Sequence, residues 1–134
     1  MRILKPRGGR RPSGYSDGIE ARGRLLVVAG QIGTTPDGTL AGVDMVSQTA
    51  QALRNIVAIL AAGDAAPAHV VRMTWYVTDM DEYRRERAKL GDAYRAAMGA
   101  HYPAMTLVAV TALVDPGARV EIEATAVVPD DAGA

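Results

Sequence analysis

The segment from residue 44 to residue 62 constrains the fold most, because its apolar residues return with the period of an α-helix. They recur every three or four positions and so share one face: Val46, Ala50, Leu53, Val57 and Leu60. Gly63 follows them as a stop signal. A helix with one apolar face must bury it against another layer, so the rest of the chain has to supply that layer.

Two further stretches have the patterns of buried strands. Residues 69–78 alternate in character, and one face carries the apolar side chains Val71, Met73, Trp75 and Val77. Residues 24–33 contain a continuous apolar run, which predicts a strand buried on both faces. Residues 19–21 are expected to pair with this strand as a hairpin that turns at Arg22 and Gly23.

The C-terminal half predicts a second helix and a second hairpin. Asp-Met-Asp-Glu opens a helix over residues 79–99. Its apolar face would carry Tyr83, Arg87, Leu90, Tyr94 and Ala97. Arg87 is the exception on this face, because a guanidinium there needs an anion, a route to the surface or a pocket. Residues 105–113 and 119–128 are predicted to be strands joined by a turn at residues 115–118.

This order of elements, ββ-α-β-α-ββ, predicts an α+β fold in a single domain over residues 1–134. We expect a mixed sheet of about six strands with both helices packed on one face. A chain of this length has no third layer for the opposite face, so we expect oligomerisation to cover it. Residues 1–14 predict a flexible basic arm, and residues 129–134 predict a mobile tail.

Composition argues against several classes of function. Fifteen basic residues balance fifteen acidic ones, whereas proteins that bind nucleic acid usually carry a basic surplus. The chain has no cysteine, and its histidines, His69 and His101, lack the spacing of metal ligands. We therefore expect no metal site. No apolar run is long enough for a signal or a membrane span, so we expect a cytoplasmic protein without a membrane partner.

Two features of the sequence could carry chemistry. Glu121 and Glu123 are two positions apart in a predicted strand and therefore point to the same face. They are either a general acid and base pair or a solvated outer row of the sheet. Arg87 either snorkels to the surface or joins a structural ion pair, or it is a cation that faces a pocket. The residues by themselves leave both choices open.

Six segments of the chain are informative together: GYSDGI at 14–19, VVAGQIG at 27–33, QTAQALRNIVAILAAGDA at 48–65, VVRMTWYVTDMDEY at 70–83, YPAMTLVAV at 102–110 and VEIEATAV at 120–127. In this order they resemble the Rid family of reactive intermediate deaminases, also called YjgF-type and formerly L-PSP endoribonucleases. The resemblance implies a chorismate-mutase-like fold and a homotrimer with a small-molecule cleft at each subunit interface. It also implies hydrolysis of an enamine or imine to a carbonyl compound and ammonia without a cofactor.

The resemblance further implies which residues form the site. A tyrosine near the N-terminus, the backbone at the GQ motif and a catalytic glutamate match Tyr15, Ala29, Gly30, Gln31 and Glu121. Ala29 stands where many members have a serine. In active deaminases of the family an arginine follows Pro-Ala and binds the substrate carboxylate, but this chain has Met105 there.

Three explanations compete for the missing arginine. Arg87 or Arg22 reaches the cleft and supplies the cation instead. Alternatively, Met105 forms an apolar wall for a neutral or larger imine, so that the substrate shifts away from 2-aminoacrylate. In the third explanation the trimer binds a metabolite without transforming it, as a binding or regulatory protein. An endoribonuclease is a more distant alternative, because no strip of basic and aromatic residues suits single-stranded RNA.

Overall fold

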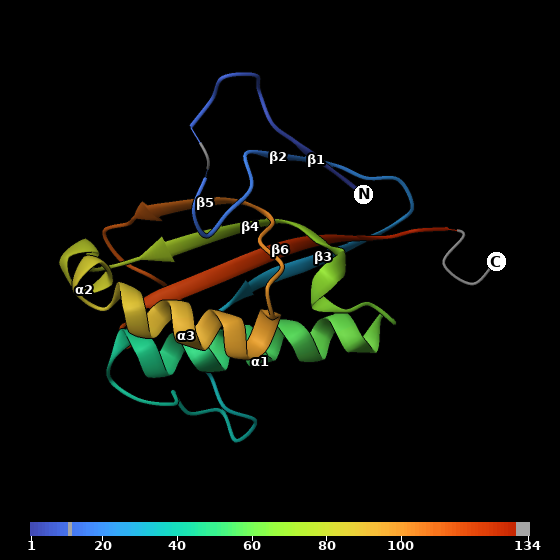
Figure 1. The fold of residues 1–134 in the computed structure, drawn as a ribbon. Coiled ribbons are helices and arrows are strands. Elements are labelled where there is room, and N and C mark those ends of the chain that lie inside the picture. The colour runs from blue at the N-terminus through green and yellow to red at the C-terminus, as the bar shows by residue number, and fades with distance from the viewer. Residues whose placement is uncertain (11, 131–134) are drawn as a thin grey trace.

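Four strands form one sheet, and the helices cover one of its faces (Figure 1). In spatial order the strands are β3 (Arg24–Gln31), β6 (Val120–Val128), β4 (Val70–Val77) and β5 (Ala104–Ala109). β6 is antiparallel to both of its neighbours, whereas β4 and β5 are parallel. The structure is a computed structural model that describes residues 1–10 and 12–130. Its mixed sheet and helices confirm the predicted α+β class.

The long helix α1 (Met45–Ala62) has the extent that its apolar period predicts. Asp44 caps it, since the carboxylate accepts a hydrogen bond from the Ser47 backbone N–H at 2.9 Å. Its buried residues are Met45, Gln48, Thr49, Ala52, Leu53, Ile56 and Leu60. The predicted apolar face is therefore rotated by part of a turn, because α1 packs against the sheet and against a second helix at once.

The helix predicted over residues 79–99 is two helices, α2 (Met80–Arg85) and α3 (Arg87–Met98). They separate at Glu86, whose φ of −102° and ψ of 15° lie outside the α-helical range. Asp79 caps α2 as predicted, by accepting a hydrogen bond from the Glu82 backbone N–H at 3.0 Å. α3 lies beside α1 on the same face of the sheet (Figure 1). Before β4, the chain makes one 3₁₀ turn, η1 (Pro67–His69).

Neither predicted hairpin forms. β2 (Gly18–Glu20) pairs with β1 (Arg2–Leu4) in a separate two-stranded sheet, rather than with β3. β1 lies within the stretch predicted to be an irregular arm. β4 separates β5 from β6, so the connection between them passes the end of β4 instead of making a tight turn. Alternation identifies a strand, but its partner depends on long-range packing. Of the tail predicted to be mobile, residues 131–134 lie outside the described residues.

Among the residues that the structure describes, no helix lies on the second face of the four-stranded sheet (Figure 1). Leu25 and Val27 of β3 are 63% and 74% exposed on it, so the predicted burial of β3 on both faces is wrong within one chain. Their neighbour Val28 points to the other face and is buried beneath α1. We call this uncovered surface the open face. Across residues 1–10 and 12–130, no helix has the length and apolar character needed to span a bilayer.

Candidate functional site

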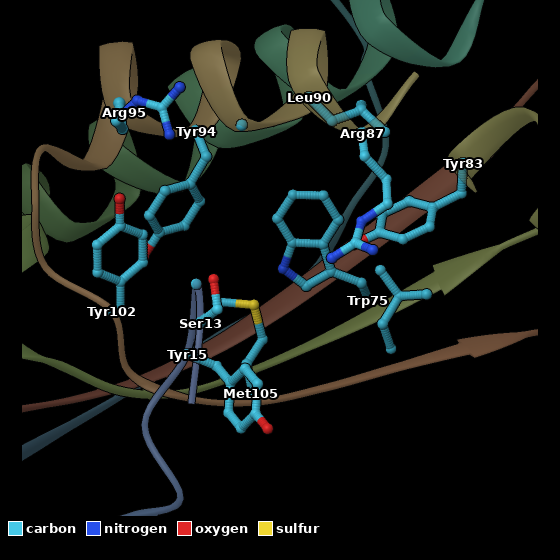
Figure 2. Close-up of a pocket in the computed structure, with 13 residues that line it drawn as sticks. Ser13, Tyr15, Trp75, Tyr83, Arg87, Leu90, Tyr94, Arg95, Tyr102 and Met105 are labelled. Atoms are coloured by element: carbon cyan, nitrogen blue, oxygen red, sulfur yellow. The ribbon is translucent and has the colours of Figure 1, made fainter. Parts of the chain in front are cut away.

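A cavity of about 680 Å³ lies at the β5 edge of the sheet, on the helix side (Figure 2). Its walls come from residues 13–15, β4, α2, α3 and the start of β5. The residues whose roles are argued below are Tyr15, Trp75, Tyr83, Arg87, Tyr94, Arg95, Tyr102 and Met105. A volume of this size is in the range of small-molecule sites in proteins.

The side chains on one face of α3 form the helix wall of the cavity. Arg87, Leu90 and Tyr94 are three and four positions apart, so their side chains share one face of the helix and line the cavity together. The sheet wall follows from the pleat of β5, in which Met105 and Leu107 point to the same side. Met105 pairs with the buried Met73 of β4, and this register fixes it on the helix side of the sheet.

Tyr15 reaches the cavity because hydrogen bonds hold its neighbour Ser16 against the residues just before β5. The Ser16 backbone N–H donates to the Pro103 carbonyl at 3.0 Å, and the Ser16 hydroxyl donates to the Tyr102 carbonyl at 2.6 Å. Ser16 also forms a parallel bridge with Ala104. The N-terminal segment is thereby held along the edge of the sheet, and Tyr15 lies beside Met105 (Figure 2).

Aromatic rings form much of the wall. Tyr94 stacks on Tyr102, with ring centroids 5.4 Å apart and an interplanar angle of 15°. The Tyr94 hydroxyl donates to the His101 carbonyl at 2.5 Å, and burial raises the pKa of this tyrosine well above its usual value. Trp75 is tilted against Tyr94 with centroids 6.5 Å apart. Its buried indole N–H has no hydrogen-bond partner among the described residues.

Two arginines of α3 reach the cavity and differ in their pairing. Arg95 forms an ion pair with Asp92 at 2.6 Å, one turn before it on the helix. Arg87 makes neither an ion pair nor a hydrogen bond within residues 1–10 and 12–130, and its side chain extends toward Trp75 and Tyr83 (Figure 2). Arg95 already has a carboxylate partner, whereas Arg87 has none among the described residues, so Arg87 is the better placed of the two to bind an anionic ligand.

A second group of predicted site residues lies on the open face. Glu121 is half-buried in β6, and the backbone of Gly30 passes directly beside its carboxylate. The strand pairing between β3 and β6 is irregular between Val28 and Gln31, which sets Gly30 apart from a regular ladder. The Gln31 side chain donates to the Ala29 carbonyl at 3.0 Å. Gly30 and Glu121 therefore form a compact carboxylate site near the start of β6, and Ala29 and Gln31 lie beside Gly30 in β3.

Beside this carboxylate site, Tyr76 donates its hydroxyl to Glu123 at 2.5 Å. The hydrogen bond to the Glu123 carboxylate raises the pKa of Tyr76, because ionising the phenol would break it. Glu123 thus has a partner within the chain. Of the two glutamates that share the open face, Glu121 has no hydrogen-bond donor among the described side chains.

The structure brings the predicted site residues together in two groups. Tyr15, Arg87 and Met105 line the cavity, whereas Gly30 and Glu121 meet on the opposite face of the same sheet, and Ala29 and Gln31 flank Gly30 in β3. Arg22, the other candidate for the missing cation, lines a separate hollow with Met1 and Arg2. Within one chain it is therefore absent from the cavity wall.

Sequence reasoning missed most of the aromatic wall. It assigned Trp75 to core packing, and the ring is indeed only 4% exposed, but it also lines the cavity. Tyr102 received no role at all. Tyr83 and Tyr94 were expected on an apolar helix face, and that face forms the cavity wall. The aromatic wall could have been suspected from the composition, because the chain has no phenylalanine and few other aromatic residues.

Comparison with known proteins identifies the class of protein that this fold and site define. The sequence profile described as endoribonuclease L-PSP matches residues 9–128. The chain therefore belongs to the endoribonuclease L-PSP family, which includes the Rid and YjgF proteins.

Individual relatives agree with this assignment. The chain is 37% identical to a RutC family protein of Pyrococcus horikoshii, over 84% of this chain and 85% of that protein. It is 34% identical to a 2-iminobutanoate/2-iminopropanoate deaminase of Capra hircus, over 78% of this chain and 73% of that protein. Among solved structures, the Rid family protein YyfB of Yersinia pestis, described as of unknown function, superposes with a TM-score of 0.81. That protein is 35% identical, and the match covers 95% of this chain and 98% of the other.

Proposed function

We propose that this protein hydrolyses an imine or enamine to a carbonyl compound and ammonia, in a site completed by two copies of the chain. One observation carries the proposal: the predicted site residues fall on two surfaces, neither of which is sufficient. The cavity that holds Tyr15, Arg87 and Met105 has no carboxylate among its lining residues. The open face has the carboxylate of Glu121 but does not enclose a ligand. Relatives named 2-iminobutanoate/2-iminopropanoate deaminase support the reaction class.

The two surfaces also support a ring of copies. When two different surfaces of one protein meet, the interface is heterologous, and repetition of it closes a ring if the rotation permits. A homotrimer is the smallest such ring, with the open face of one copy against the cavity edge of the next. Leu25 and Val27 would supply apolar contact area for this interface, because both are largely exposed in a single chain.

In this arrangement Glu121 acts as general base and general acid. It accepts a proton from a water molecule as the water oxygen forms a bond to the carbon of the protonated imine, and the electrons of the C=N double bond move to the nitrogen. The resulting carbinolamine carries hydroxyl and amino groups on one carbon. Glu121 returns the proton to the nitrogen, the C–N bond breaks, the hydroxyl proton is released and ammonia leaves as the carbonyl forms. Tyr15 and the backbone of Gly30 and Gln31 position the substrate. The reaction consumes one water and needs no cofactor.

Met105 shifts the substrate away from 2-aminoacrylate. A hydrogen bond to a charged group contributes roughly 1.5–3 kcal/mol, and a thioether cannot replace an arginine in this role. Arg87 supports binding of a carboxylate nonetheless, because it lines the same cavity and has no partner among the described residues. The presence of Met105 in place of an arginine also favours a second candidate function, that of a trimeric protein that binds a metabolite without transforming it.

The test is hydrolysis of imines generated in place by an amino-acid oxidase, followed through imine loss and ammonia release. Glu121→Gln is expected to lower the rate by about a hundredfold or more, the usual contribution of a general acid–base group. Glu123→Gln is the matched control, because it removes the neighbouring carboxylate on the same face. Wild-type turnover by Glu121→Gln would refute the mechanism. Ligand binding without ammonia release from any imine would favour the second candidate.

A further inference from the structure

The aromatic residues of this chain are concentrated at one place. The sequence contains five tyrosines, one tryptophan and no phenylalanine. Five of these six side chains line the cavity: Tyr15, Trp75, Tyr83, Tyr94 and Tyr102. The sixth, Tyr76, lies on the open face with Glu123. Aliphatic side chains and methionines fill most of the core, so packing alone does not require rings to gather here.

The Trp75 indole N–H is a donor that the described residues leave unused. Its side chain is 4% exposed, and the nitrogen has no partner. An indole N–H cannot accept a hydrogen bond, and a buried donor left unpaired is costly. In Figure 2 this nitrogen faces the part of the cavity between Ser13 and Met105. Because the nitrogen atom itself is buried, an acceptor oxygen on a ligand would satisfy it once a neighbouring side chain moves aside.

The cavity therefore has two chemically different ends. Arg87 and the Trp75 indole form a cationic, hydrogen-bonding end, whereas Tyr94 and Tyr102 form an aromatic end (Figure 2). Arg95 lies at the aromatic end but is paired with Asp92. At about 30 Å³ for each non-hydrogen atom, the volume of a water molecule in the liquid, a three-carbon imino acid fills roughly 200 Å³. The cavity of about 680 Å³ has room for a much larger side chain.

We propose that the cavity selects 2-imino acids that carry an aromatic ring. The carboxylate binds between Arg87 and the Trp75 N–H, and the ring packs against Tyr94, Tyr102 and Tyr15. Met105 and Leu107 form the apolar wall between the two ends. This inference rests on the proposed function, in which such a substrate and water give the aromatic 2-oxo acid and ammonia.

Binding is tested with the 2-oxo acid products, which need no turnover. Phenylpyruvate and pyruvate are titrated into the full chain by calorimetry, and quenching of Trp75, the single tryptophan, reports whether the cavity is occupied. Phenylpyruvate is expected to bind at least tenfold more tightly. Trp75→Phe keeps a ring but removes the donor, so calorimetry should show about tenfold weaker binding of phenylpyruvate.

Arg87→Leu is expected to weaken binding of phenylpyruvate by a similar factor, because it removes the cation that faces the carboxylate. Arg84→Leu is the matched control, since Arg84 is exposed on α2, pairs with Asp81 at 3.8 Å and is absent from the cavity wall. Equal affinities for phenylpyruvate and pyruvate, or unchanged binding in both Trp75→Phe and Arg87→Leu, would overturn the inference.

Turnover separates this inference from the proposed function. Imines generated from phenylalanine and from alanine are compared, and the aromatic imine is expected to have at least tenfold higher kcat/KM. Hydrolysis of both with equal efficiency would overturn the aromatic selectivity and leave the deaminase proposal standing. Selective binding of phenylpyruvate without hydrolysis of either imine would support the aromatic cavity and refute the deaminase proposal.

Discussion

Gly30 and Glu121 lie so close on the open face that a Cβ atom on Gly30 would come 2.6 Å from the Glu121 Oε2 atom. That separation is well inside van der Waals contact, so any side chain at position 30 would have to displace the carboxylate. The glycine thus determines where the proposed catalytic group can lie. Its role concerns the approach of two groups rather than the conformational freedom of the backbone.

Gly30→Ala should therefore slow imine hydrolysis by about tenfold or more, because it moves the Glu121 carboxylate from its place. The melting temperature should change little, since Gly30 is exposed and the displaced side chain can turn toward solvent. Ammonia release and thermal unfolding measure the two effects. Gly9→Ala is the control, because the nearest atom to its added Cβ would be the Pro6 carbonyl oxygen at an ordinary 3.5 Å. Full activity of Gly30→Ala would show that the position of Glu121 does not limit the reaction.

Glu82 is a buried carboxylate that joins three parts of the chain. One oxygen accepts a hydrogen bond from Arg119 at 2.9 Å, and the other accepts from the Met45 backbone N–H at 3.0 Å, in the first turn of α1. Glu82→Ala should lower the free energy of unfolding by about 2 kcal/mol, because a helix-end donor and a guanidinium lose their acceptor. Urea unfolding measures this. Asp81→Ala, at a carboxylate that is 89% exposed, should cost less than about 0.5 kcal/mol; equal losses would contradict the assignment.

Asp44 should make stability depend on pH. The Ser47 backbone N–H donates to its carboxylate and holds the pKa of Asp44 below its usual value. Because the folded-state pKa is the lower one, the charged group stabilises the fold above the ordinary aspartate pKa. This contribution disappears as the pH falls through the folded-state pKa. Asp44→Asn keeps an acceptor oxygen but does not titrate, so its unfolding free energy should decline less than wild type between about pH 5 and pH 2. Parallel curves in urea unfolding would exclude a contribution from Asp44.

Local sequence patterns predicted which helices and strands form better than they predicted how the strands pair. The period of residues 44–62 predicted α1 to within a residue, because the backbone hydrogen bonds of a helix join residues four apart within the same segment. Strand pairing depends on distant segments, and both hairpins were therefore placed wrongly. The same limit applies to the site. Met105 and Glu121 are on opposite faces, which follows from the pairing of both strands with β4 and could not be deduced from either strand alone.

Val27 tests the proposed ring of copies. It is 74% exposed in β3, on the open face that lacks a covering layer. The wild type is expected to have about three times the monomer mass of 14.1 kDa in sedimentation or light scattering. Val27→Asp should shift the protein toward monomer, because an unpaired carboxylate would be buried in the interface. Val114→Asp is the matched control at a fully exposed valine outside the sheet. A monomeric wild type would refute the intersubunit site.

Arg87 is the cation proposed to bind the substrate carboxylate in a cavity where Met105 supplies none. Arg87 and Met105 line the same cavity, so a guanidinium introduced at position 105 should substitute for one removed at position 87. Arg87→Leu should lower kcat/KM for carboxylated imines by about tenfold or more, and adding Met105→Arg should restore most of the loss. Neutral imines should respond to neither change.

Met105→Leu is the control for altered packing, because it preserves the apolar wall and adds no charge. The two single variants and the double variant form a cycle that measures the coupling between positions 87 and 105. If Met105→Arg raises activity on carboxylated imines by the same factor with and without Arg87, the two positions act independently. Arg87 would then not be the group that binds the carboxylate. Unchanged kcat/KM in Arg87→Leu would give the same answer directly.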